Sequence, residues 1–157
     1  MTLLNISLCL PAPDVVALQQ KHSIVAITKR FIVPGKSFAL LTGNDFPGAE
    51  QLERLYQASF LEKERALNEE IFEVTHWASC ELCQPIEGDS AIAAIANCTL
   101  WTKAAFDQHI GGRLFLSFLR VYKLSQVINL ETAPSRAQRF KFLPLPKTTE
   151  ANTEKPT

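Results

Sequence analysis

The chain has 157 residues, 46% of them hydrophobic and 20% charged, and its 16 basic and 16 acidic residues give a net charge of zero. This composition is typical of one globular domain, and it lacks the basic excess that marks many nucleic-acid-binding proteins. No run approaches the roughly 18 to 20 apolar residues of a membrane helix. The apolar N-terminus also lacks the basic region and cleavage site of a signal peptide. We therefore expect a cytoplasmic protein without membrane insertion.

The N-terminal part predicts three strands, one helix and one turn. Apolar and polar residues alternate over 3–10, which indicates a strand, and a proline at its first turn favours a short helix over 13–19. A β-branched run over 23–28 and an apolar run over 37–42 predict two further strands. The Pro34-Gly35 pair between them is a turn signal.

The middle of the chain predicts further helices and two longer strands. An apolar stripe at helical spacing favours a helix over 48–67, and shorter helices are expected over 90–96 and after Thr102 as N-cap. Strands are predicted over 71–82 and 114–124, the second of them apolar on both faces. We therefore expect an α+β fold with three or four short helices and a small, strongly bent β-sheet or barrel.

The C-terminal part changes in character and becomes rich in proline. We expect a single globular domain over 1–130 and a mostly disordered tail over 131–157. Within this tail, residues 139–146 have the basic, hydrophobic and proline-containing composition of a docking motif. Its candidate partner-binding residues are Arg139, Phe140, Phe142 and Leu143. The alternative is that this segment packs on its own domain as a last strand.

No arrangement of residues indicates catalysis. The sequence has no Gly-x-Ser-x-Gly elbow, no phosphate-binding glycine loop and no His-Glu-x-x-His run, and its three histidines lie far apart. We therefore predict no enzymatic activity and no cofactor.

The cysteines are the residues that most resemble a metal site. His76, Cys80 and Cys83, followed by Cys98, supply the ligand types that zinc prefers. However, residues 76 and 80 share one face of an extended strand while residue 83 points to the other, unless a turn intervenes. A redox pair is disfavoured because no helix begins after Cys83. We therefore interpret these thiols as small buried hydrophobic groups and expect no metal.

A small basic and aromatic segment follows the strand predicted over 23–28. Lys29, Arg30 and Phe31, with Lys36 beyond the turn, would contact phosphate groups or the carboxylates of a partner. The alternative is a solvated strand end.

Two blocks of residues resemble one protein family. The first consists of Asp14-Val-Val-Ala-Leu-Gln-Gln, Ser23-Ile-Val-Ala-Ile and Pro34-Gly-Lys-Ser-Phe-Ala-Leu-Leu. The second consists of Trp77-Ala78, Leu100-Trp101-Thr102 and Leu119-Arg-Val-Tyr-Lys-Leu. Together they span roughly residues 12–128 and resemble domain of unknown function 1802, a family of photosynthetic, cyanobacterial organisms. This resemblance implies a family without implying an activity.

The layout of the N-terminal part is also similar to the PUA-like superfamily, including its ASCH branch. The shared features are an Ile-Ser-Leu strand, a proline, a short helix and Pro-Gly-x-x-Phe before a strand. The resemblance implies a small bent β-barrel that binds RNA or modified bases. Catalytic members carry a Gly-x-Lys-x-x-Glu turn, of which the segment 20–25 keeps only Lys21, so amide hydrolysis is not expected.

These observations lead to two hypotheses about function. The first is a non-enzymatic module that binds RNA or a nucleotide through a PUA-like barrel. Its candidate binding residues are Lys21, Lys29, Arg30 and Lys36. The alternative is an accessory or assembly protein that contacts a protein partner through residues 134–157.

Overall fold

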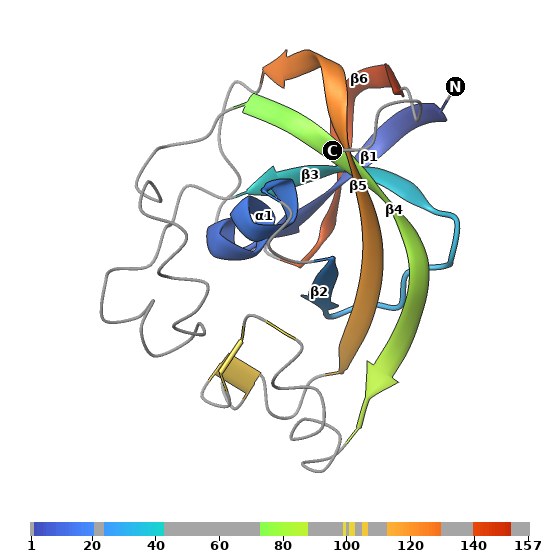
Figure 1. Cartoon of the computed structure of the whole chain (residues 1–157). Coiled ribbons are helices and arrows are strands. Elements are labelled where there is room, and N and C mark those ends of the chain that lie inside the picture. The colour runs from blue at the N-terminus through green and yellow to red at the C-terminus, as the bar shows by residue number, and fades with distance from the viewer. Residues whose placement is uncertain are drawn as a thin grey trace.

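One curved, six-stranded mixed sheet forms the framework of the molecule (Figure 1). The computed structural model describes residues 2–20, 24–42, 73–87, 99, 101–102, 105–106, 113–129 and 140–151. The strand order is β2-β5-β4-β3-β1-β6. The elements are β1 (Thr2–Leu10), α1 (Ala12–Gln19), β2 (Val25–Thr28), β3 (Ser37–Thr42), β4 (Glu73–Ile86), β5 (Leu114–Asn129) and β6 (Phe142–Ala151). The long strands β4 and β5 arch together, and α1 lies on the inner side of their curve.

The expectation of a barrel with three or four helices is wrong for the part of the chain that the structure describes. The sheet is open, because the edge strands β2 and β6 do not pair with each other. The eight-residue α1 is the one complete helix among the described residues, and no helix there is long and apolar enough to cross a membrane. Strands dominate because β4 and β5 extend beyond their apolar runs. The helices expected over 48–67 and 90–96 lie outside the described residues.

The N-cap expected at Thr102 is present. The Thr102 hydroxyl accepts a hydrogen bond from the backbone N–H of Ala105 at 3.4 Å, and Ala105 and Phe106 have helical backbone conformation. The same N–H also donates to the Thr102 carbonyl at 3.0 Å, so the hydroxyl supplies a second acceptor at the start of this helical turn.

The segment expected to form a disordered tail contains the edge strand β6. It pairs antiparallel with β1, with Phe142 opposite Leu8 and Pro144 opposite Ile6. On its other side β1 pairs in parallel with β3. Prolines are tolerated in β6 because an edge strand has a row of N–H groups that no neighbour uses. Residues 142–151 therefore belong to the same sheet as the strands before residue 130. They form a last strand on their own domain, which was the alternative to a docking motif.

Both faces of the sheet are covered over its middle part. One hydrophobic cluster joins Val15 and Leu18 of α1 to side chains from β1 to β5. A second cluster contains Trp77 of β4, whose ring stacks on that of Tyr122 in β5 with 4.4 Å between centroids. The apolar run at the start of β5 belongs to the first cluster, and the second cluster takes its β5 residues from Tyr122 onward. The sheet is thus a firm support for the segments at its edges.

Candidate functional site

The segment 29–36, which connects β2 to β3, displays most of the basic residues expected to bind a ligand. Lys29, Arg30, Phe31 and Lys36 are exposed, whereas Ile32 is only 1% exposed. A turn closes with a hydrogen bond from the Lys36 N–H to the Val33 carbonyl at 3.0 Å. Gly35 within this turn has a φ of 94°, a conformation that other residues adopt at a cost. The segment thus points its cations outward and one apolar side chain inward.

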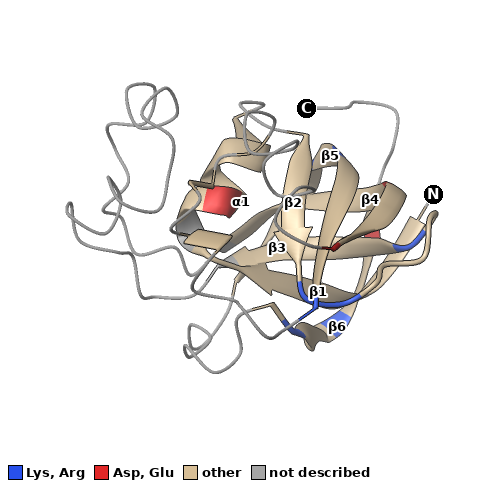
Figure 2. Cartoon of the chain, turned by 90° about the horizontal axis from the view of Figure 1, so that it is seen from below, with Lys and Arg blue, Asp and Glu red and all other residues tan. Residues whose placement is uncertain are grey.

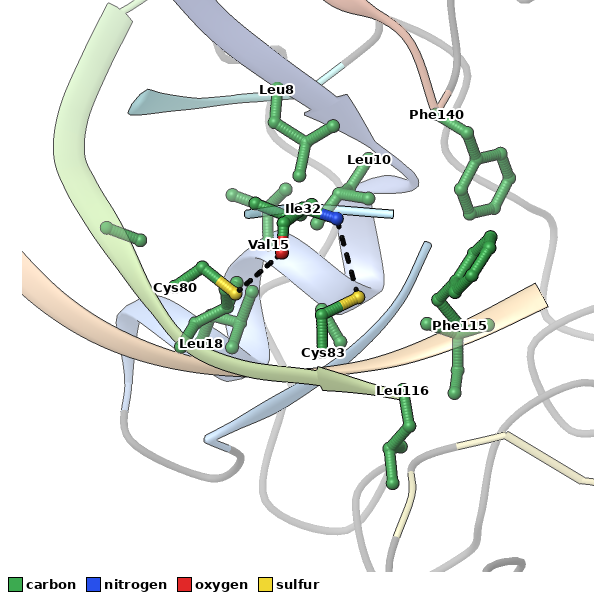
Figure 3. Packing of buried hydrophobic residues seen from close by; sticks show 14 of the residues in the cluster. Leu8, Leu10, Val15, Leu18, Ile32, Cys80, Cys83, Phe115, Leu116 and Phe140 are labelled. Carbon is green, nitrogen blue, oxygen red and sulfur yellow. Dashed lines mark hydrogen bonds between the residues drawn. The ribbon is translucent and has the colours of Figure 1, made fainter. Parts of the chain in front are cut away.

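The backbone of Ile32 is hydrogen-bonded to two thiols of β4 (Figure 3). Its N–H donates a hydrogen bond to Sγ of Cys83 at 3.4 Å, and the Cys80 thiol donates to its carbonyl at 3.7 Å. Two backbone bonds add to this attachment, from the Gly35 N–H to the Cys80 carbonyl at 2.7 Å and from the Cys80 N–H to the Lys36 carbonyl at 2.9 Å. The segment is therefore fixed to the sheet at Ile32 and again at the turn that follows it.

The prediction that Cys80 and Cys83 face opposite sides of the strand is wrong. The pairing of β4 with β5 is irregular between Cys80 and Leu82, and such a bulge shifts the alternation of side chains by one residue. Both thiols consequently lie on the buried side and contact Ile32. Burial raises the pKa of the Cys80 thiol, and the neighbouring Cys83 raises it further. Both thiols are thus buried and contact the backbone of Ile32.

His76, the third residue of the candidate metal site, has a partner of its own. Its Nδ1 lies 2.7 Å from the Thr75 hydroxyl oxygen. Burial lowers its pKa, and the positive charge of Lys123 lowers it further. Within the residues that the structure describes, no three His, Cys, Asp or Glu side chains are grouped to hold a metal, and Cys98 lies outside those residues.

Two lysines of the segment 29–36 lie over two aromatic rings of the C-terminal segment. The Lys29 Nζ is 4.8 Å from the ring centroid of Phe140, and the Lys36 Nζ is 4.5 Å from that of Phe142. Phe140 and Phe142 are two residues apart, so their Cα atoms are separated by at most about 7 Å. The sequence suggested two separate candidate surfaces, and in the structure two residues of the first contact two residues of the second.

Phe140 supports this surface from inside the protein. It is 5% exposed, and its ring packs edge-on against Trp101 at 6.0 Å. Its backbone has a φ of 64°, which is strained for a bulky residue, and its N–H donates to the Cys9 carbonyl at 2.6 Å. Phe140 is thus a core residue, and a partner protein cannot reach its ring.

The other residues of the expected docking motif are also used within the chain. Phe142 is half-buried and packs edge-on against Phe38 at 5.6 Å. Leu143 is half-buried and packs against the second hydrophobic cluster. Arg139 and the basic candidate Lys21 lie outside the described residues.

A buried carboxylate contacts Trp101, the residue on which the Phe140 ring packs, and no pattern in the sequence indicates this role. Asp14, in the first turn of α1, is 5% exposed. Its Oδ1 accepts a hydrogen bond from the indole Nε1–H of Trp101 at 2.8 Å. Trp101 also contacts the rings of Phe106 and Phe140. Residues 14 and 101 are too far apart in the chain for any spacing rule to relate them.

The surface formed by the segments 29–36 and 140–143 is basic although the whole chain is neutral. The two segments contribute four cations and no acidic residue (Lys29, Arg30, Lys36 and Lys141). Figure 2 shows basic residues directly after β2 and on β6. We call these four cations, with Phe31, Phe140 and Phe142, the basic–aromatic surface. Its charges and rings meet where the segment 29–36 contacts the start of β6.

These features define a curved, open mixed sheet with a basic–aromatic surface at its edges. The family model of domain of unknown function DUF1802 matches residues 7–157, and the chain belongs to this family. The match confirms the resemblance seen in the sequence and extends it through β6. The crystal structure of ASCH from Zymomonas mobilis is similar to the chain, with a TM-score of 0.47 and 13% sequence identity, over 95% of this chain and 88% of that chain. None of the curated proteins compared with the chain matches it.

Proposed function

We propose that this protein is a non-enzymatic module that binds RNA through the basic–aromatic surface. The observation that carries the proposal is the placement of Lys29 and Lys36 over Phe140 and Phe142, beside the exposed Arg30 and Phe31. Phosphate groups supply most of the affinity of proteins for nucleic acids, and clustered Lys and Arg side chains are the groups that bind them.

The contacts with the rings prepare the two lysines for a polyanionic ligand. An ammonium group over an aromatic face loses part of its conformational freedom before the ligand arrives, which lowers the entropic cost of binding. Each ammonium group has three N–H donors, and its exposed side remains open to phosphate oxygens. The attachment of Ile32 to β4 fixes the backbone that carries both lysines.

The alternative of a C-terminal hook for a protein partner loses support from the structure. Phe140 is buried, and Phe142 and Leu143 are half-buried within the chain. A partner could still add a strand to the free edge of β6, but Pro144 and Pro146 lack the backbone N–H groups that such pairing uses. The exposed cations therefore indicate the better-supported function.

The direct test is fluorescence anisotropy with a labelled 20-nucleotide single-stranded RNA at 50 mM and 200 mM salt. If four cations contact phosphates, a slope of about −0.7 per contact predicts about 50-fold weaker binding at the higher salt concentration. The double variant Lys29→Glu/Lys36→Glu should lose binding at both.

A matched control changes the same amount of charge elsewhere. Arg120 and Lys123 are exposed residues of β5, and Arg120 forms a solvent-exposed ion pair with Glu81 at 3.3 Å. The variant Arg120→Glu/Lys123→Glu should bind RNA nearly as well as the wild type. The proposal fails if the wild type does not bind RNA at 50 mM salt, or if both double variants lose the same affinity.

A further inference from the structure

Phe31 differs from the other two rings of the basic–aromatic surface in its accessibility. It is 52% exposed, whereas Phe140 is buried and Phe142 is half-buried. In the described part of the chain, it is the one aromatic residue among the large hydrophobic side chains that are exposed. Lys29 and Arg30 precede it directly in the sequence. Covering an exposed apolar ring with a ligand is favourable, because it removes apolar surface from water.

The position of Phe31 is fixed from the protein side. Its ring makes an edge-to-face contact with Phe115 of β5, with 6.1 Å between centroids and 70° between planes. The next residue, Ile32, is bound to the two thiols of β4. On the other side, the Thr28 hydroxyl donates a hydrogen bond to the Arg30 carbonyl at 3.1 Å. The ring is therefore held in place before any ligand binds.

A fixed, half-exposed ring beside phosphate-binding cations matches the chemistry of an unpaired nucleotide. A base that is free of its own helix can stack on an aromatic side chain while its phosphates contact nearby Lys and Arg. In a duplex, the bases are stacked on one another and their faces cannot reach the ring. The same ring without neighbouring cations would fit an apolar protein partner equally well.

We infer that Phe31 stacks on an unpaired base and makes the basic–aromatic surface selective for single-stranded RNA over duplex RNA. This inference rests on the proposed function, since it names the form of nucleic acid that the same surface prefers. Phe31 adds base contact to the phosphate contacts of Lys29, Arg30 and Lys36. The ring favours every base because all bases have a stacking face, so sequence preference is not part of the inference.

The test compares three labelled probes of equal length by anisotropy. They are a single-stranded 12-mer RNA, the same strand in a duplex, and an abasic 12-mer that keeps only the sugar–phosphate backbone. Replacing Phe31→Leu keeps an apolar side chain and removes the stacking face. Because base–aromatic stacking contributes about 1–3 kcal/mol, this variant should bind the single strand about 5- to 150-fold more weakly. Its binding to the duplex and to the abasic probe should not change.

Two further variants separate stacking from other effects. Phe31→Tyr keeps an aromatic face and should bind like the wild type. Val33→Ala shortens another exposed apolar side chain of the same segment and should also leave binding to all three probes unchanged. An unchanged melting temperature of Phe31→Leu shows that its fold is intact.

Several outcomes overturn the inference. The inference is wrong if Phe31→Leu binds the single strand as tightly as the wild type does. It is also wrong if this variant loses the same affinity for all three probes. Equal binding of the wild type to the abasic probe and the RNA also fails it. In each case, loss of binding in Lys29→Glu/Lys36→Glu leaves the proposed function standing. A wild type that binds none of the probes refutes both. The inference is also overturned if the protein binds a purified protein partner after ribonuclease treatment and Phe31→Leu abolishes that binding. This result would assign the ring to a protein interface.

Discussion

The segments 29–36 and 140–143 contribute to the same surface in opposite ways. The first exposes its charged side chains and buries only Ile32, whereas the second buries the ring of Phe140 and supports the lysines from below. Both segments have a mixture of basic and aromatic residues, so composition alone does not distinguish them. The comparison shows that one such segment can form the contact surface while another determines its shape.

Removing the supporting segment should have the largest effect. Deletion of residues 140–157 eliminates β6 and the buried groups of Phe140, Leu145 and Ala151. We expect no cooperative thermal unfolding transition by circular dichroism, because the loss exceeds about 5 kcal/mol, the lower end of the stability of small domains. Deletion of only residues 152–157 should preserve the transition. An unchanged melting temperature after the larger deletion would show that β6 does not support the sheet.

The next largest effect is expected at Phe140 itself. Phe140→Ala should lower the free energy of unfolding by about 3–5 kcal/mol because it removes a buried ring. Phe140→Gly should be less destabilising than Phe140→Ala by about 1 kcal/mol, since glycine tolerates the φ of 64°.

Phe142 is the matched control, because its backbone does not have the positive φ of Phe140. There, alanine should be tolerated better than glycine, as is usual in a strand. Urea denaturation measures all four variants. The same ranking at both positions would contradict a strained backbone at Phe140.

Several elements could be predicted from the sequence because their signals are local. The alternation over 3–10, the proline that starts α1 and the Pro34-Gly35 turn each depend on neighbouring residues only, and each corresponds to an observed feature. The prediction of disorder is wrong for residues 142–151, because β6 is ordered by its pairing with β1, which is more than 130 residues away. No local pattern distinguishes a proline-containing edge strand from a disordered segment.

Only part of the candidate site could be predicted from the sequence. Lys29, Arg30 and Lys36 could be identified because cations beside a turn are usually exposed. Their pairing with Phe140 and Phe142 depends on how the sheet edges meet, which the sequence does not state. The role of the cysteines depended on one irregular position in β4, and the simple alternation of strand residues could not locate it.

A moderate effect is expected for the carboxylate behind Phe140. Asp14→Ala removes the acceptor of the buried Trp101 indole N–H and should lower the free energy of unfolding by about 1–3 kcal/mol. Asp14→Asn keeps an acceptor oxygen and should be less destabilising. Both are measured by urea denaturation at pH 7. Equal losses in the two variants would show that the acceptor oxygen is not what stabilises Trp101.

The smallest expected effect concerns His76, in the half of β4 before the two cysteines. Because its pKa is lowered in the folded protein, the unfolded chain binds its proton more readily. The free energy of unfolding should therefore decrease as the pH falls below about 6.5, the ordinary histidine pKa, and this contribution should be constant above it. His76→Gln should reduce the slope of stability against pH.

Lys123 provides the matched variant for this titration, since its charge is the second cause of the lowered pKa. Lys123→Gln keeps the histidine and should reduce the slope only in part. A slope in His76→Gln equal to that of the wild type would assign the pH dependence to other groups.

The pairing of β1 with β6 also constrains when the protein can fold during synthesis. β1 is made first, yet the partner on one of its sides comprises residues 142–151. That part of the sheet cannot form until the last strand has left the ribosome, whereas the hairpin of β4 and β5 can form earlier. One edge of β1 must therefore remain unpaired until residues 142–151 have been synthesised. The support under Lys29 and Lys36 accordingly forms only after residues 140–151 have been synthesised, although the lysines themselves are made more than 100 residues earlier.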